Sequence, residues 1–290
     1  AIRRALAAAK VEKLDLLCMD ACLLGQFEVA DELRDAARVL VASEAIVPPF
    51  GLPYEKVLPD LAGSTDPAAA ARSVVKHFGD HCKNVQERDA TMSALDLGKA
   101  DEAREALRAL VEKLRPAAGA QWPALCRSMY YAESYGGRKD FLAGRAATAS
   151  VDLLDCLKRM RASVKDFPAE TEYQKLTKVL PQFVLASYAG RARRLSQGLA
   201  VYAPIRRDTI RAGYGLTHFA RHSGWLGLLG QLYMAHAREA SVPEVTDARL
   251  VDRAGKEIPR AISCAGHGVR ITVVGKNILW TIVEHLQPVE

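Results

Sequence analysis

Several features that define whole classes of proteins are missing from this 290-residue chain. No apolar run approaches the roughly 18 residues that a membrane-spanning helix needs, so no membrane partner is expected. The sequence contains no zinc knuckle, no glycine-lysine phosphate loop and no acidic loop of the D-x-D-x-D-G kind that binds calcium. Its motifs therefore predict neither a metal site nor a nucleotide site.

A recognisable disulfide framework is also missing. Of the six cysteines, Cys18 and Cys22 lie close together, and the other four are scattered along the chain. Free thiols fit a reducing compartment best, so a cytoplasmic location is expected. Secretion stays open as the alternative, because any signal peptide would lie ahead of Ala1.

The net charge of +6 is carried by dispersed basic residues rather than by a nucleic-acid-binding motif. The densest basic group is Arg191, Arg193, Arg194, Arg206, Arg207 and Arg211. We interpret it as a solvated surface or as a contact for an acidic partner, and no nucleic-acid partner is expected. A salt-sensitive complex with nucleic acid would be needed to favour the other interpretation.

The most informative segment is the apolar run at residues 14–25, which ends on Asp20-Ala21-Cys22 before a glycine-bearing turn. Such a run is typical of a central strand in a parallel sheet, where ligands bind beyond the carboxyl end of the strand. A helical pattern and a second apolar strand, residues 39–43, follow. In this strand-helix-strand unit, Cys22 lies where the first strand gives way to the helix. It could be a nucleophile, or it could simply be a small buried hydrophobic residue.

Two stretches of the chain carry a resemblance to a known family. Residues 19–35, MDACLLGQFEVADELRD, and residues 40–44, LVASE, closely resemble the clostripain family of cysteine endopeptidases. The pattern of that family is near F-D-A-C-L-M-G-x-x-E-V-A-Y-E-L-R, followed by L-V-A-S-E-E. Residues 91–97, 198–204 and 219–228 are similar to further family motifs, so the resemblance covers about residues 13–233.

The resemblance implies an α/β fold, a caspase-like three-layer α/β/α sandwich with a mostly parallel sheet. We expect this catalytic core over residues 1–235 and a small β-rich C-terminal module over residues 236–290. It further implies that Cys22 attacks the scissile carbonyl while a histidine accepts the thiol proton. No cofactor is required on this interpretation, although calcium is possible because some family members need it.

The histidine of the expected Cys-His dyad is not apparent, because in this clan it precedes the cysteine and all seven histidines here follow Cys22. His267-Gly268 imitates the clan's His-Gly but lies outside the matched region. His77 and His81, with Cys82 beside them, have helical spacing without a further ligand cluster, which favours a solvated pair over a metal face.

We therefore expect a separate N-terminal chain of the same precursor to carry the catalytic histidine, with Ala1 as a processing boundary. Proteolytic cleavage would then activate the enzyme, and this chain alone would be inactive. The alternative is a non-catalytic pseudoprotease or scaffold of the same fold. Retention of both Cys22 and Asp20 favours the protease.

Specificity for a basic P1 side chain follows from Asp20, because a partly desolvated carboxylate pairs well with a guanidinium or an ammonium group. The resemblance associates this position with cleavage after arginine and, in many members, lysine. Phe50 stands where the family has a loop acid. The alternative is that Asp20 only orients a loop. For the backbone of a protein substrate, we expect binding by strand addition to Val41, Ala42 and Ser43.

Coarse periodicity predicts several helices and a terminal β module. The helical patterns cover residues 68–78, 99–115, 122–131, 151–164 and 173–194, and those at 99–115 and 151–164 are expected to cover the sheet. Residues 270–283 predict two strands around Gly275-Lys276-Asn277. The module could dock on the core, recruit a partner or belong to a larger domain.

Overall fold

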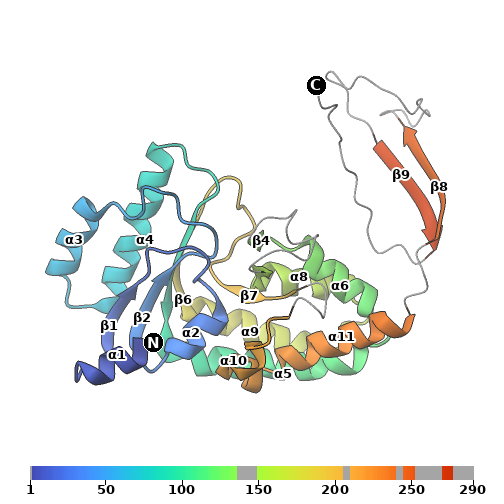
Figure 1. Ribbon diagram of the computed structural model, residues 1–290, viewed down its shortest axis with the longest axis horizontal. Helices are drawn as coiled ribbons and strands as arrows, with labels where there is room; N and C mark the ends of the chain where they lie inside the picture. The colour runs from blue at the N-terminus through green and yellow to red at the C-terminus, as the bar shows by residue number, and fades with distance from the viewer. Residues whose placement is uncertain (1, 136–148, 205–209, 240–243, 252–269, 277–290) are drawn as a thin grey trace. The chain divides into compact units, whose positions relative to one another are not determined.

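The computed structural model describes residues 2–135, 149–204, 210–239, 244–251 and 270–276 (Figure 1). Contacts within the chain separate two compact units, Ala1–Ala235 and His236–Glu290. The first unit contains helix α1 (Ile2–Ala8) and all the elements discussed below except the terminal hairpin and the end of the last helix.

The first unit is built around a four-stranded sheet in the order β1-β2-β3-β6. The strands are β1 (Leu14–Cys18), β2 (Ala37–Ala42), β3 (Thr91–Asp96) and β6 (Val184–Ala189). Strands β1 and β2 are parallel, and β3 is antiparallel to both β2 and β6. Strands β1, β2 and β6 thus run in one direction. Only one of the three strand pairs is parallel, however, so the sheet is mixed rather than mostly parallel.

The number of helices between strands explains these directions. The single helix α2 (Phe27–Leu33) joins β1 to β2 and brings the chain back to the starting edge, which gives a parallel pair. Two helices, α3 (Tyr54–Gly63) and α4 (Pro67–Asn84), join β2 to β3. The pair returns the chain to the edge where β2 ends, so β3 runs the opposite way.

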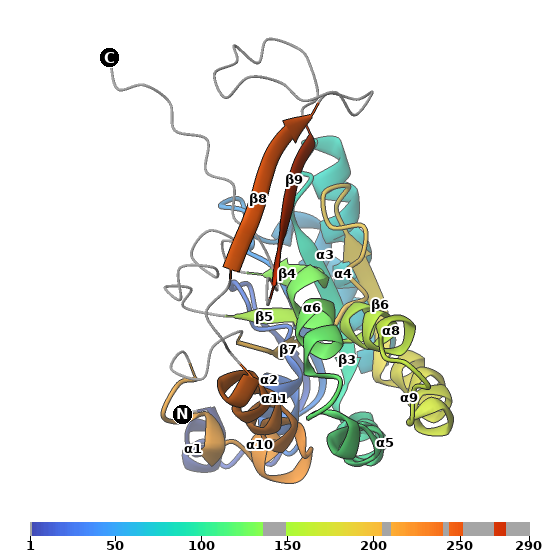
Figure 2. The same cartoon turned by 90° about the vertical axis from the view of Figure 1, so that its right-hand side faces the viewer.

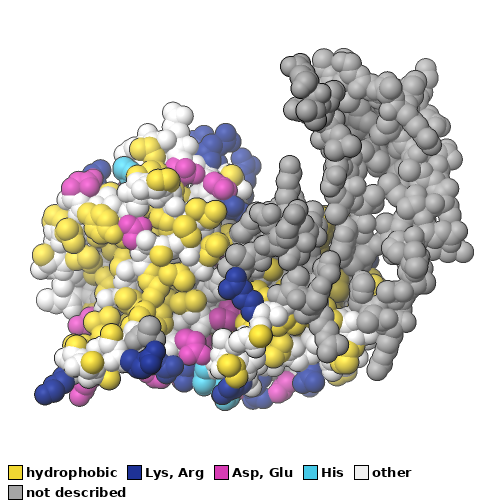
Figure 3. Space-filling model, viewed as in Figure 1, with side chains coloured by type: hydrophobic (Ala, Val, Ile, Leu, Met, Phe, Trp, Pro, Cys, Tyr) yellow, Lys and Arg dark blue, Asp and Glu magenta, His cyan; other side chains and the backbone are white. Residues whose placement is uncertain are grey.

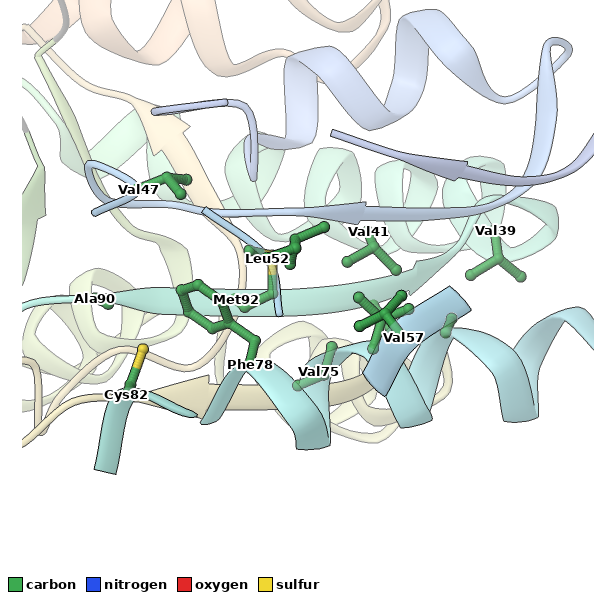
Figure 4. Packing of buried hydrophobic residues seen from close by; sticks show 13 residues of the cluster. Val39, Val41, Val47, Leu52, Val57, Val75, Phe78, Cys82, Ala90 and Met92 are labelled. Atoms are coloured by element: carbon green, nitrogen blue, oxygen red, sulfur yellow. The ribbon is translucent and has the colours of Figure 1, made fainter. Parts of the chain in front are cut away.

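Helix α4 covers one face of the sheet and contacts all four strands. Figure 4 shows its Phe78 and Val75 packed among Val39, Val41 and Met92 from the strands. On the other face lie α2, α5 (Ala100–Leu114), α9 (Glu170–Phe183) and α10 (His218–His222). Helices on both faces confirm the expected three-layer α/β/α sandwich.

Rings from three separate elements fix the packing of that second helical layer. Phe27 of α2 lies 5.2 Å from the ring of Phe183 and 4.9 Å from the ring of Phe219, measured between centroids. All three side chains are fully buried. Because buried aromatic rings contribute large apolar areas, this cluster anchors the helix that follows Cys22.

A second, antiparallel sheet contains β4 (Ser134–Tyr135), β5 (Ser150–Asp152) and β7 (Ala200–Tyr202). Helices α6 (Trp122–Tyr131) and α8 (Leu153–Ser163) pack together, and α8 also contacts β5. A parallel bridge between Gln26 and Ala200 joins this sheet to the segment after Cys22. Helix α8 therefore lies over the second sheet, whereas α5 covers the first as expected.

The helix predicted over residues 173–194 is wrong in its second half. Helix α9 ends at Phe183, and residues 184–189 form β6. Pairing with β3 supplies ladder hydrogen bonds to these six residues, so the tertiary contact overrides the local apolar spacing. Residues 151 and 152 of the predicted helix 151–164 likewise belong to β5.

The remaining elements complete the described chain. Short 3-10 turns lie at Leu97–Lys99, Arg115–Ala117 and Tyr214–Leu216, and α11 spans Trp225–Glu239. The second unit contains an antiparallel hairpin of β8 (Glu244–Val251) and β9 (Arg270–Lys276), shown in Figure 2. The predicted strand after residue 277 and His267-Gly268 lie outside the described residues. No described helix is long and apolar enough to cross a membrane.

Candidate active site

Cys22 lies in a loop beyond β1 rather than at the last residue of that strand. The strand ends at Cys18, but the backbone continues beside the chain that leaves β2. Leu23 N–H donates to Ala45 O at 3.0 Å, and Gly25 N–H donates to Ser43 O at 2.8 Å. Leu23 has φ 62°, and the three residues that precede it, 20–22, are exposed. The backbone thus presents Cys22 outward from a rigid frame.

Gly25 is essential to this frame because the two backbones approach closely. A Cβ atom at this position would lie 2.7 Å from Glu44 N and 2.8 Å from the carbonyl carbon of Ser43. Only a residue without a side chain permits that approach.

The thiol of Cys22 contacts the backbone of Val47. Val47 N–H donates to Sγ at 3.3 Å, and Sγ lies 3.9 Å from Val47 O. The thiolate is the reactive form of cysteine. A thiolate can accept a hydrogen bond from an N–H group that is directed at its sulfur. The segment after β2 therefore touches the candidate nucleophile directly, a contact that sequence reasoning missed.

Burial distinguishes Cys22 from the other described cysteines. Cys22 is exposed, whereas desolvation raises the pKa of Cys18, Cys82 and Cys126 to about 12 and raises the pKa of Cys156 as well. Nearby acids, Asp20 in the case of Cys18, add to the shift. Among the five cysteines described, Cys22 alone combines an exposed thiol with a backbone donor.

The described histidines are engaged elsewhere. His77 lies 2.9 Å from Asp60, His81 packs edge-on against Phe50 with centroids 4.7 Å apart, and His218 Nδ1 lies 2.7 Å from Asp31. His222 bonds the carbonyl of His218 and stacks on its ring. Within the described residues, no histidine bonds Cys22. No group of three or more metal ligands occurs there either, at His77 and His81 included.

Asp20 lies two residues before Cys22 and is exposed, but one of its oxygens is already occupied. Asp20 Oδ2 accepts hydrogen bonds from Leu52 N–H at 3.1 Å and from the Tyr54 hydroxyl at 2.8 Å. The bond to Asp20 raises the pKa of Tyr54, which stays a neutral donor. Gly51 has φ 63°, and a Cβ there would lie 2.5 Å from Oδ2. Asp20 therefore orients the Gly51–Tyr54 loop, whatever else it binds.

The structure corrects the expected strand addition at Val41, Ala42 and Ser43. Strand β2 is internal to the sheet, with Val41 paired to both Cys18 and Ala94 and Ala42 paired to Ser93. The Ser43 carbonyl accepts Gly25 N–H. All three residues are fully buried. An internal strand has no free edge, so these residues frame the site instead of pairing with a substrate.

Sequence reasoning also missed a set of buried acids behind the site. Glu28, Glu44 and Asp152 come from different segments, and all three are buried. Desolvation raises the pKa of Glu28 to about 7 and that of Asp152 to about 6, and it raises the pKa of Glu44 well above its usual value. Glu44 is the last residue of the LVASE motif that resembles the family, and this was the signal that could have identified it. The sequence around Asp152 contains no such signal.

A three-layer sandwich with an exposed cysteine beyond the carboxyl ends of β1 and β2 is the arrangement expected of a caspase-like cysteine peptidase. The model of the clostripain family matches residues 1–219. This chain belongs to the clostripain family of cysteine peptidases. No curated protein sequence gives a significant match.

Solved structures with the same fold support this assignment. A clostripain from Bacteroides thetaiotaomicron in complex with the peptide inhibitor BTN-VLTK-AOMK is 15% identical, with a TM-score of 0.57 over 76% of this chain and 91% of that one. A B. fragilis cysteine protease is 20% identical, with a TM-score of 0.53 over 78% and 93%. An inactive zymogen C11 protease from Parabacteroides distasonis is 16% identical, with a TM-score of 0.56 over 77% and 62%.

Proposed function

We propose that this chain carries the nucleophile of an endopeptidase that cleaves after arginine or lysine, with Cys22 as the attacking residue. The observation that carries the proposal is the exposed Cys22 thiol with the Val47 N–H at 3.3 Å, in a chain of this family. Thiolate attack on the scissile carbonyl breaks the peptide C–N bond, and the proposed histidine protonates the leaving amine. Water then hydrolyses the acyl-enzyme. The backbone N–H of Cys22 is suited to donate to the developing oxyanion.

The general base comes, on this proposal, from an N-terminal chain of the same precursor that adds to the edge of the sheet beside β1. Within the described chain, β1 pairs with β2 only. Leu14, Leu16, Leu17 and Cys18 of β1 are half-buried. Figure 3 shows hydrophobic side chains gathered on the face where β1 and β2 lie in the matching view of Figure 1. An apolar strand edge of this kind favours pairing with another strand.

Asp20 is proposed to bind the basic P1 side chain through Oδ1, which has no hydrogen bond within the described residues. Because its other oxygen is held by two donors, this carboxylate is fixed in place and can pair with a guanidinium group through Oδ1. The inhibitor bound to the B. thetaiotaomicron clostripain contains lysine beside its AOMK group, in keeping with a basic P1. Phe50 would contact the methylene stem of that side chain.

Activation by proteolytic cleavage belongs to the same proposal. The Parabacteroides distasonis relative is described as an inactive zymogen. Cleavage between the two chains would free the histidine-bearing strand and the Cys22 loop to reach their final positions.

The test uses the full-length precursor that contains both the N-terminal segment and this chain. We expect arginyl reporter peptides to be cleaved, and Cys22→Ala to lower kcat/KM by at least about a thousandfold. The control Cys126→Ser, in α6, is expected to keep full activity. Activity retained by Cys22→Ala would refute the assignment. A folded precursor with its N-terminal segment that cleaves nothing would favour the scaffold alternative.

A further inference from the structure

The segment Ser43 to Val47 forms one wall of the candidate site, and its first residues are fixed from both sides. Leu23 and Gly25 of the Cys22 loop donate to its carbonyls, at Ala45 and Ser43. On the opposite side, Thr91 Oγ1 accepts Ala45 N–H at 3.0 Å and lies 3.0 Å from Ser43 Oγ. Glu44 stands between these two anchored residues.

The side chain of Glu44 reaches from this wall to the second sheet. Its Oε2 accepts Gly198 N–H at 3.2 Å, just before β7. Its carboxyl also interacts with Tyr135 at the end of β4 and with Asp152 at the end of β5. One side chain therefore joins the wall of the site to the ends of all three strands of the second sheet.

The two carboxyl groups lie beside each other, because the adjacent N–H groups of Gln197 and Gly198 donate to Asp152 and to Glu44, respectively. Asp152 already accepts backbone N–H bonds from Asp155 at 2.7 Å and from Gln197. Glu44 Oε1 is buried and has no donor among the described residues. Two buried carboxylates in contact repel, and a shared proton replaces that repulsion by a hydrogen bond.

We propose that Glu44 and Asp152 share one proton, with Glu44 donating to Asp152, and that this bridge is the positioning device that holds the Ser43–Val47 wall against Cys22. Desolvation of both groups favours the protonated form of the pair. The inference rests on the proposed function, because it assigns a role in positioning the site of Cys22. Glu44 would thus act as a positioning residue, although it does not touch the substrate.

The other charged groups around the pair leave the proton in place. Tyr135 donates its hydroxyl to Ser196, and Arg193 lies over the Tyr135 ring at 5.5 Å. Arg193 is itself paired with Asp89 and Glu133. Asp155 is paired with Arg159 at 3.0 Å. No cation among the described residues contacts the Glu44 carboxyl, so raising the pH leaves two facing anions.

The sign of the pH effect follows from the raised pKa values. A carboxyl whose folded-state pKa is raised contributes stability below its unfolded-state pKa, and that contribution is lost as the pH rises through the folded-state value. For the pair, the bridge is complete while one proton remains and is lost when both groups ionise. The wall of the site should therefore loosen on the alkaline side.

The decisive comparison is Glu44→Gln against Glu44→Leu in the full-length enzyme. The amide introduced by E44Q can donate to Asp152 without titrating, so kcat/KM at neutral pH should stay within about twofold of wild type, whereas E44L should lose at least about tenfold. The alkaline decline in kcat/KM that follows from loosening of the wall should be weaker in E44Q. Glu28→Gln, which removes a different buried acid, is the matched control and should keep the wild-type decline.

Infrared difference spectra supply a readout independent of Cys22 activity. The wild-type protein should show a protonated carboxyl signal at neutral pH that E44Q lacks. If that signal is absent, or if E44Q and wild type share one alkaline profile while E44L remains fully active, the inference is overturned. Neither outcome bears on the Cys22→Ala result, so failure of this inference and failure of the proposed function are distinguishable.

Discussion

Asp20 has two oxygens, and the structure uses only one of them to build the site. Oδ2 holds the loop through Leu52 N–H and Tyr54, and Gly51 packs against the same carboxylate. The two interpretations that the sequence leaves open, an orienting residue and a specificity residue, are therefore compatible. An anchored carboxylate is a better partner for a cation than a freely rotating one, because less side-chain entropy is lost on binding.

Asp20→Asn tests the specificity role with little change in shape. The amide keeps an acceptor for Leu52 N–H and loses the charge, so kcat/KM for arginyl peptides should fall by roughly 10- to 100-fold, as expected for a charge-assisted hydrogen bond. Peptides with a neutral P1 residue should change little. The matched control is Glu170→Gln on α9, where Glu170 pairs with Arg161 at 2.7 Å on the surface. An unchanged arginine preference would remove Asp20 from the P1 pocket.

At the scale of elements, the site depends on how the chain leaves β2. Strand β3 begins at Thr91 beside this exit, and the Thr91 hydroxyl replaces the ladder hydrogen bonds that end with Ala42. Ser43, Glu44 and Ala45 of the exit are all buried. A buried N–H without an acceptor is costly, so this hydroxyl is one of the anchors of the Ser43–Val47 wall, beside the bonds from Leu23 and Gly25.

Thr91→Val is expected to weaken that junction. The substitution conserves shape but leaves Ala45 N–H without its acceptor, which should lower the free energy of unfolding by roughly 1–3 kcal/mol. Chemical denaturation measures the change, and kcat/KM should fall with it because the wall contacts Cys22. Thr91→Ser keeps the hydroxyl and should stay close to wild type. Equal stability of the Val and Ser variants would contradict the role of this hydrogen bond.

At the scale of the whole first unit, Glu28 ties the two sheets and their helices together. It belongs to α2, accepts Tyr202 N–H of β7 at 3.0 Å, and accepts the Tyr214 hydroxyl at 2.9 Å. Desolvation raises its pKa to about 7, and it raises the pKa of Tyr214 as well, so both groups are neutral in mildly acidic solution. The protonated acid is therefore the form that the folded unit favours.

The stability of the unit should consequently depend on pH through Glu28. With the folded-state pKa near 7 and the ordinary value at 4.5, the contribution is complete below pH 4.5 and is lost as the pH rises through 7. The total is about 3 kcal/mol by the pKa difference. Glu28→Gln should flatten this part of the curve of unfolding free energy against pH. A curve with the same slope as wild type would show that Glu28 does not titrate as proposed.

Much of the architecture is readable from local patterns. The apolar runs predicted β1 and β2, and the helical pattern at residues 122–131 matches α6, because these segments carry the periodicity of the structure they adopt. Residues 184–189 do not carry the periodicity of the structure they adopt. Their apolar spacing is helical, but they form β6 by pairing with β3. The reversal of β3 likewise depends on the pair α3 and α4, which local spacing does not encode.

The sequence by itself determined the family, the candidate nucleophile Cys22 and its neighbour Asp20, because those residues lie together in one contiguous motif. Only the tertiary structure decided that β2 is internal and closed to substrate, that Val47 touches the thiol, and that Glu44 meets Asp152. These relations join residues far apart in the chain. Burial and backbone pairing create them, and both arise only when the two sheets are assembled.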